Sequence, residues 1–148
     1  MAEPTHEERL VIYQMAAARR FNYESIAWQI PGLSLTAQAF LMTIGLAPGA
    51  GHLARVAAGF LAIVVSLLTI HSVLRHRRHE LADSIWLSNF ERSEGWETVH
   101  DAASVRASRL GIPESAFGGR YKVTYVWLAG LSLFGLVGLG IMISGIVG

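Results

Sequence analysis

Three histidines in the middle of the chain are the residues best spaced to bind a metal ion. They are His71, His76 and His79, with Glu80 and Asp83 just beyond them. His79 and Asp83 are one helical turn apart, so a helix would bring them to one face. However, no H-E-x-x-H pattern is present, and three arginines that interleave with the histidines would repel a cation. The sequence therefore predicts no metal site.

The interleaved arginines are Arg75, Arg77 and Arg78, which directly follow a long apolar stretch. Basic residues at the end of a membrane-spanning segment commonly contact anionic lipid headgroups. We predict this contact for all three arginines. A second interpretation stays open for His71, whose imidazole near the membrane boundary would respond to pH.

No other residue pattern predicts catalysis. Ser84, Ser88 and Ser93 lack the G-x-S-x-G context of a serine hydrolase. The Gly118-Gly119 pair does not form a phosphate-binding loop. The chain has no cysteine, which excludes disulfides, thiolate metal ligands and cysteine nucleophiles. A net charge of +1 gives no general attraction to nucleic acid. We predict a protein that is not an enzyme and that binds no cofactor, no metal and no nucleic acid.

The composition is typical of a membrane protein. Of the 148 residues, 52% are hydrophobic and 16% are charged, and the mean hydropathy is +0.40. The apolar residues form three blocks, 26–46, 56–74 and 123–148. We expect no cleavable signal peptide, because residues 1–25 are polar or amphipathic. The predicted fold class is an all-α integral membrane protein with three transmembrane helices plus amphipathic cytosolic helices, packed as one compact unit.

The block 56–74 is the clearest of the three. It contains no formally charged residue, and its length is about that of a helix crossing the hydrocarbon core. Small residues recur every fourth position in and just before it, and such a row typically marks close contact with another helix. The predicted helix-packing residues here are Ala54, Ala58, Ala62 and Ser66.

The block 26–46 contains Pro31, which must interrupt the hydrogen-bond ladder of a helix. We expect a kink at Pro31, because a helix that began there would be short for a bilayer. Ser34 and Gln38 share one face, and such polar side chains must find a polar partner or water. They either line a pore or make a contact between helices. Turn-forming residues at 47–51 then join the first two blocks into a transmembrane hairpin, 26–74.

The N-terminal segment, 1–25, is predicted to be a cytosolic amphipathic helix. The T-x-x-E spacing of Thr5 and Glu8 is that of a capping box. The helix lies either at a membrane or subunit interface or simply in solvent.

The segment 75–122 is predicted to be cytosolic and helical. The helix of the second block should continue to about Arg92, and a further helix should run from 96 to 110 and stop at Gly111 and Pro113. Its large aromatic residues should pack together or on the N-terminal helix, and they form a candidate partner surface. These are Trp86, Phe90 and Trp96.

The block 123–148 contains no charge and is rich in glycine, which indicates close packing against neighbouring helices or a flexible pore. Tyr121, Tyr125 and Trp127 mark the membrane interface where the block begins. The predicted helix-packing residues of this block are Gly138, Gly140, Ser144 and Gly145.

The basic residues predict the topology. Eleven of the twelve Lys and Arg residues lie before the first block or between the second and third, and only Arg55 lies elsewhere. Cytoplasmic loops carry such an excess. The N-terminus and 75–122 should therefore be cytoplasmic, and the C-terminus periplasmic or extracellular.

Short motifs in the first half of the chain resemble a known family. They are the run E-E-R-L-x-x-Y-Q from Glu7 to Gln14, Arg19-Arg20 before the first block, and Leu35-Thr36 within it. Over about residues 7–90 the chain resembles the RipA-like octameric family of small bacterial membrane proteins and, more loosely, SLATT-type domains. The third apolar block departs from the two-span pattern. The resemblance implies a homo-oligomer, with the pore proposed for SLATT-type members, and it supplies no catalytic residues.

These patterns predict a non-enzymatic, homo-oligomeric, multi-pass protein of the bacterial inner (plasma) membrane. Its partners would be the lipid bilayer and further copies of itself. Whether it forms a pore or channel stays open. The alternative is an accessory or scaffold subunit that docks a cytosolic protein partner through its cytosolic helices.

Overall fold

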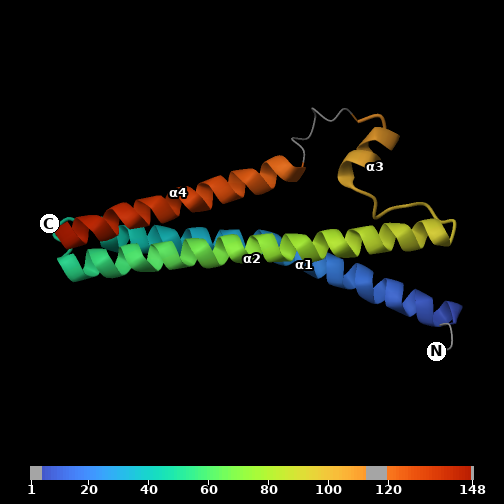
Figure 1. The fold of residues 1–148 in the computed structure, drawn as a ribbon, viewed down its shortest axis with the longest axis horizontal. Coiled ribbons are helices and arrows are strands. Elements are labelled where there is room, and N and C mark those ends of the chain that lie inside the picture. Colours follow the sequence, from blue (N-terminus) through green and yellow to red (C-terminus); the bar gives the residue numbers. More distant parts are fainter. Residues whose placement is uncertain (1–4, 113–119, 148) are drawn as a thin grey trace. The chain divides into compact units, whose positions relative to one another are not determined.

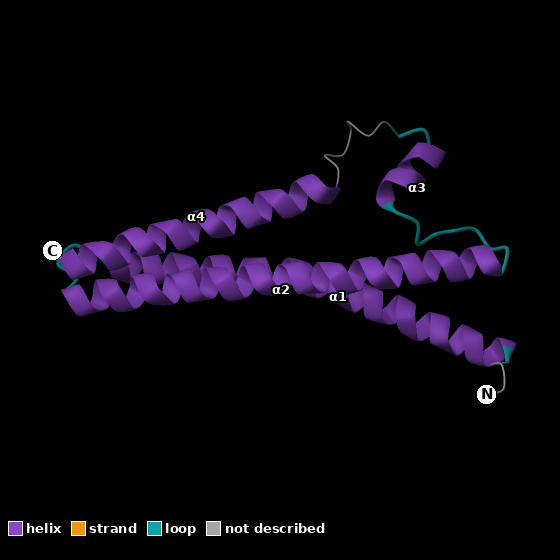
Figure 2. Ribbon diagram, in the orientation of Figure 1, coloured by secondary structure: helices purple, strands orange, loops and turns teal. Residues whose placement is uncertain are grey.

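The computed structural model of the chain describes residues 5–112 and 120–147. Every regular element in these two ranges is an α-helix, as the sequence predicts (Figure 2). In chain order they are α1, His6–Gly45, α2, His52–Ser93, α3, Ala103–Arg109, and α4, Arg120–Val147 (Figure 1).

The chain divides into two compact units. The polar unit comprises Met1–Ala27 and Arg75–Arg120, and the apolar unit comprises Trp28–Leu74 and Tyr121–Gly148. The long helices α1 and α2 each contribute one part to each unit. The expectation of a single compact unit was wrong. Charged side chains are costly to bury among apolar ones, so the charged and uncharged parts of the two helices make their contacts separately.

Helix α1 begins with the predicted capping box. The backbone amide of Thr5 donates to the Glu8 carboxylate at 2.8 Å, and the amide of Glu8 donates to the Thr5 hydroxyl at 3.3 Å. These two bonds satisfy amides that have no partner within the helix. The helix continues through Pro31 to Gly45, so no new helix begins at the proline.

Helix α2 is the predicted long helix, and it ends one residue beyond the expected Arg92. Gly95 has a φ of +71°, a left-handed conformation that glycine adopts without strain. The amide of Trp96 bonds the carbonyl of Glu91 at 2.9 Å, and the amide of Gly95 bonds the carbonyl of Arg92 at 3.2 Å. This pair of bonds is a Schellman motif, which turns the chain out of the helix.

The predicted helix from 96 to 110 was wrong in its first half, because only Ala103–Arg109 is helical there. The preceding residues are held by α2 instead. The amide of His100 donates to the Glu91 carboxylate at 3.1 Å, and the carbonyl of His100 accepts from the Ser84 hydroxyl at 2.8 Å. Backbone groups used in this way are not available for a helix. A second left-handed glycine, Gly111, follows α3 at the predicted place. Pro113 lies outside the described residues.

Glycines allow the helices of the apolar unit to approach closely. A Cβ atom added at Gly59 of α2 would lie 2.5 Å from the carbonyl oxygen of Gly138 of α4. One added at Gly145 would lie 2.9 Å from the carbonyl oxygen of His52. No real side chain fits at such distances, so α2 and α4 pack backbone against backbone.

Within the described ranges, two helices are long and apolar enough to cross a membrane, α2 and the Val123–Val147 part of α4. Only 28% and 17% of their most apolar stretches are buried inside the protein. The core helix of a soluble domain would be mostly buried, so these surfaces suit an apolar solvent. The predicted first span, 26–46, is helical but is not one of these two helices, because several polar residues lower its hydropathy. They include Gln29, Ser34, Thr36, Gln38 and Thr43.

We expect Gly138→Val to destabilise the apolar unit by about 1–3 kcal/mol, because overpacking forces the two helices apart. Gly130→Val on the same helix is the matched control, since nothing lies within 4 Å of a Cβ added there. Thermal unfolding in detergent measures both variants. Equal unfolding temperatures would contradict the close packing of α2 and α4.

Candidate functional site: polar contacts within the two units

The polar face predicted in block 26–46 points at α2. Gln38 is 0% exposed, and its Nε2 donates to the Ala62 carbonyl at 2.9 Å and to the Ser66 hydroxyl at 2.8 Å. One turn earlier, Ser34 accepts a hydrogen bond of 2.9 Å from the Thr69 hydroxyl. Of the two alternatives left open by the sequence, the structure gives this face a contact between helices. Lining a pore would require the same side chains to face water.

The row of small residues on α2 is buried against the neighbouring helices. Ala58, Ala62 and Ser66 are buried, and Ala54 is partly exposed. A Cβ added at Gly45 of α1 would lie 3.4 Å from the Ala58 Cβ. The row therefore serves packing within one chain.

The small residues of α4 form two groups. Gly138 and Gly145 lie against α2, as the close approaches above show. Gly140 and Ser144 are exposed instead. Nothing lies within 4 Å of a Cβ added at Gly140, and the Ser144 hydroxyl donates to the carbonyl of Ile141 in its own helix. These two residues lie on the exposed side of α4.

The three arginines of α2 that follow its apolar part, Arg75, Arg77 and Arg78, also differ in exposure. Arg77 is largely buried and donates to the Glu80 carboxylate. Arg75 and Arg78 are exposed and remain available for the predicted headgroup contact. Among the residues described, no group of three or more His, Cys, Asp or Glu side chains is placed to hold a metal ion. Two of the three histidines pack on a tyrosine instead: the ring centroid of Tyr23 lies 5.9 Å from that of His76 and 5.4 Å from that of His79.

The three aromatic residues proposed as a partner surface form a cluster with Tyr13 of α1. The Phe90 ring centroid lies 5.3 Å from that of Tyr13 and 5.6 Å from that of Trp86. Trp96 meets both Tyr13 and Phe90 edge to face. Phe90 is buried, whereas Trp86 and Trp96 each keep 41% of their surface exposed. The cluster is thus a core contact with two partly exposed tryptophans.

Glu91 is the polar centre of this cluster and is 1% exposed. Its carboxylate accepts hydrogen bonds from the Tyr13 hydroxyl at 2.7 Å and from the His100 backbone amide at 3.1 Å. The Nδ1 atom of His100 lies 2.5 Å from the same carboxylate. Glu91 therefore joins three segments of the chain: α1, α2 and the stretch before α3.

The environment of Glu91 shifts two pKa values. Burial and the hydrogen bond to the Glu91 carboxylate raise the pKa of Tyr13 to about 12. Burial acts to raise the pKa of Glu91 as well, but the hydrogen bonds from His100 and Tyr13 outweigh it and hold that pKa below its usual value. At neutral pH the pair is therefore a phenol donating to a carboxylate. A tyrosine with a raised pKa stays protonated at neutral pH and is a poor proton donor to a substrate, so this arrangement favours a structural role.

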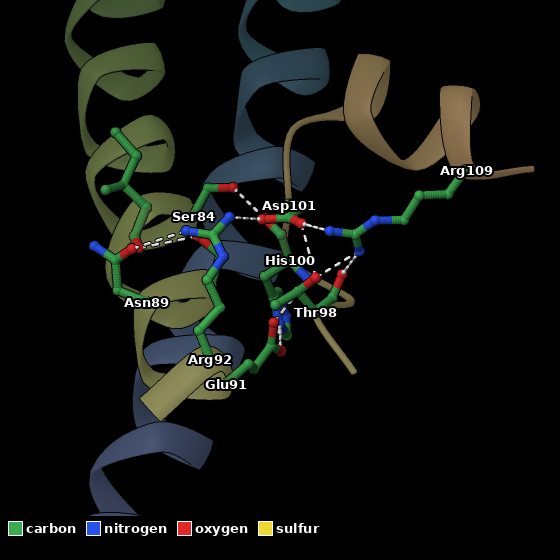
Figure 3. Close-up of polar contacts among 10 residues, drawn as sticks. Ser84, Asn89, Glu91, Arg92, Thr98, His100, Asp101 and Arg109 are labelled. Atoms are coloured by element: carbon green, nitrogen blue, oxygen red, sulfur yellow. Dashed lines mark hydrogen bonds and ion pairs between the residues drawn. The ribbon is translucent and has the colours of Figure 1, made fainter. Parts of the chain in front are cut away.

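A second carboxylate, Asp101, is also buried and fastens α3 to α2 (Figure 3). It accepts from Arg92 of α2 and from Arg109 of α3. The hydroxyl of Thr98 donates to it at 2.7 Å. The Thr98 hydrogen bond and the two guanidinium groups hold the pKa of Asp101 below its usual value, against the effect of burial. The carboxylate is therefore charged and fully paired.

Sequence reasoning missed both carboxylates. The side-chain partners of Glu91 lie nine and 78 positions away, and the two arginines paired with Asp101 lie eight and nine positions away, outside the spacing of neighbours on one helix. The available signal was the polar run from Glu97 to Asp101 shortly after Gly95, which suits a loop better than a helix.

Comparison with protein-family models, curated proteins and solved structures found no match to this chain. The resemblance to the RipA-like octameric family therefore stays a prediction.

We expect Gln38→Leu to destabilise the apolar unit by about 0.5–1.5 kcal/mol, because two hydrogen bonds between α1 and α2 are lost. Thr43→Val is the control, since the Thr43 hydroxyl donates to Ala39 of its own helix and faces outward. A double-mutant cycle of Gln38→Leu with Ser66→Ala, read by unfolding in detergent, isolates the pair. A coupling energy of zero would count against the contact.

The raised pKa of Tyr13 predicts an alkaline loss of stability in the polar unit. The group contributes stability below its ordinary pKa of 10.0, and this contribution is lost as pH rises towards about 12. Tyrosinate absorbance should include a late-titrating step, which Tyr13→Phe removes and Tyr125→Phe, a substitution at an exposed position of α4, retains. A late step that survives Tyr13→Phe would disprove the assignment.

Proposed function

We propose that this chain is a three-span, non-enzymatic protein of the bacterial inner membrane that self-associates, with its polar unit in the cytoplasm. The observation that carries the proposal is the pairing of α1 with α2 inside the polar unit. Arg19 of α1 donates two hydrogen bonds to Asp83 of α2, at 2.9 and 2.5 Å. The start of α1 and the end of α2 must therefore lie on one side of any membrane.

This pairing bears directly on the number of spans. If the apolar part of α2 crosses the bilayer, the chain must cross once more between 28 and 51 to return both polar parts to the same side. Only the first apolar block is available for that crossing. Most of its polar side chains make hydrogen bonds within the protein, as a segment in lipid requires, although the Oε1 atom of Gln38 is buried without a partner. Gln38 and Ser34 bond to α2, and Thr36 and Thr43 donate to carbonyls of α1.

The distribution of charge supports the same division. No Asp or Glu lies within the ranges of the apolar unit, 28–74 and 121–148, although the chain has eleven. The excess of Lys and Arg in the polar ranges favours a cytoplasmic polar unit and a C-terminus on the periplasmic or extracellular side.

Self-association is supported by the outward small residues of α4. Gly140 and Ser144 face away from the other helices of their own chain, and small residues on an exposed helix face allow a second copy to approach. We do not propose ion conduction along the face that carries Ser34 and Gln38, because both side chains form hydrogen bonds with α2. The alternative, an accessory subunit that docks a cytosolic protein, draws on the partial exposure of Trp86 and Trp96.

Single cysteines test the topology, because the native chain has none. In spheroplasts, a membrane-impermeant maleimide should label Gly51→Cys, whereas Glu7→Cys and Glu97→Cys should react only after lysis. All three positions are exposed. The mass of the wild-type particle in detergent should exceed that of one chain.

Labelling of Glu7→Cys together with Gly51→Cys in intact spheroplasts would refute the three-span topology. A one-chain mass would refute self-association. A stoichiometric second protein in the particle would favour the accessory-subunit alternative instead.

A further inference from the structure

One side of α2 in the polar unit carries no carboxylate. From residue 75 to residue 91 the exposed positions follow helical spacing, 75, 78, 82, 85 and 89, with two exposed neighbours at 79 and 86. Residues three and four positions apart share one face of a helix. We call this face the outer stripe of α2. Its residues are Arg75, Arg78, His79, Ala82, Ile85, Trp86 and Asn89.

The acidic residues in the same part of α2 all face inward. Glu80 is 3% exposed, Asp83 is 7% exposed and Glu91 is 1% exposed. Each accepts a hydrogen bond from a side chain of the polar unit, Glu80 from Arg77 and the other two from residues of α1. The outer stripe therefore carries positive charge with no carboxylate of its own to balance it.

The three arginines at the start of this part of α2 differ in what they contact. Arg77 is largely buried against Glu80, as described above. Arg75 and Arg78 are exposed, and among the residues described neither forms an ion pair. Like charges one helical turn apart repel each other. A ligand that brings negative charge between the two guanidinium groups would remove this repulsion.

Arg75 and Arg78 lie at the level of the lipid phosphates if α2 crosses a bilayer. Arg75 directly follows the apolar part of α2, which ends at Leu74, and α2 is long and apolar enough to cross a membrane. The headgroup layer is roughly 5–7 Å thick on each side of the hydrocarbon core. Arg78 lies about 4.5 Å beyond Arg75 along the helix axis, so both residues fall within this layer. Arg92, which is also exposed, lies about 25 Å beyond Arg75 and outside the layer.

From these observations we infer that Arg75 and Arg78 together bind the phosphate group of an anionic lipid. Their Cβ atoms are about 5–6 Å apart on the helix, which lets two planar guanidinium groups share the oxygens of one phosphate. A lipid is favoured over a free phosphate ion because the apolar part of α2 just before Arg75 suits its acyl chains. An anionic headgroup is favoured over a zwitterionic one because the outer stripe has no carboxylate to receive an ammonium group. The inference goes beyond the proposed function and rests on the membrane insertion proposed there.

Lipid binding to the full-length protein in detergent tests this site. Native mass spectrometry shows which lipids stay bound when phosphatidylglycerol or phosphatidylcholine is added. We expect phosphatidylglycerol to bind more tightly. Arg75→Gln and Arg78→Gln should each weaken its binding about fivefold, because an arginine near an anionic surface contributes about 1 kcal/mol. Arg106→Gln is the matched control, since it removes the same charge from an exposed arginine outside the outer stripe.

A charge-conserving variant tests the shared phosphate. Arg75→Lys combined with Arg78→Lys keeps both charges but loses the two planar groups that each offer several donors. Its affinity for phosphatidylglycerol should fall between that of the wild type and that of the combined Arg75→Gln and Arg78→Gln variant. Full affinity in the lysine variant would overturn the grip of two guanidinium groups on one phosphate.

Three other results would overturn the lipid site. They are equal binding of the two lipids, an equal loss in Arg106→Gln, and displacement of phosphatidylglycerol by millimolar inorganic phosphate, which would assign the arginines to a soluble anion. Each of these results leaves the proposed topology intact. Cysteine labelling that refutes the topology would overturn the topology and the lipid site together.

Discussion

The antiparallel pairing of α1 with α2 is the contact on which the rest of the protein depends. In the polar unit it is made by ion pairs and by the Tyr13–Glu91 hydrogen bond, and in the apolar unit by the Gln38 amide. Each kind of contact suits its surroundings. A neutral amide can be buried among apolar helices at modest cost, whereas a carboxylate needs several charged or hydrogen-bonding partners. The later elements then add to a helix pair that already exists: α3 through Asp101, and α4 through its glycines.

The buried carboxylates explain why the polar unit holds an irregular stretch in one conformation. Exposed ion pairs contribute little, but loss of a partner from a buried charge is costly. Glu91 and Asp101 are both nearly inaccessible, and each is bonded from more than one segment. Three of their partners, Thr98, His100 and Arg109, lie between Gly95 and Gly111. The non-helical residues before α3 are therefore held by tertiary contacts rather than by their own propensity.

Local signals made the helices predictable, and tertiary contacts limited the rest. The Thr5–Glu8 capping box and the continuation of α2 beyond its apolar block could both be predicted from residue spacing alone. The helix expected from 96 failed because the backbone of His100 is bound by α2, a contact that no local pattern encodes. On α4, spacing marked Gly138 and Gly140 equally, since a helical wheel does not say which stripe of small residues meets the neighbour.

The Gln38 contact has a consequence for biogenesis in the proposed membrane setting. Its acceptors, Ala62 and Ser66, lie 24 and 28 residues later in the chain. When the first apolar block leaves the ribosome, α2 has not yet been synthesised, and the amide has no protein partner. The block would therefore wait at the membrane surface or in the translocation channel until α2 emerges. The two segments would then enter the bilayer together as a hairpin, with the short turn at 46–51 as its leading end.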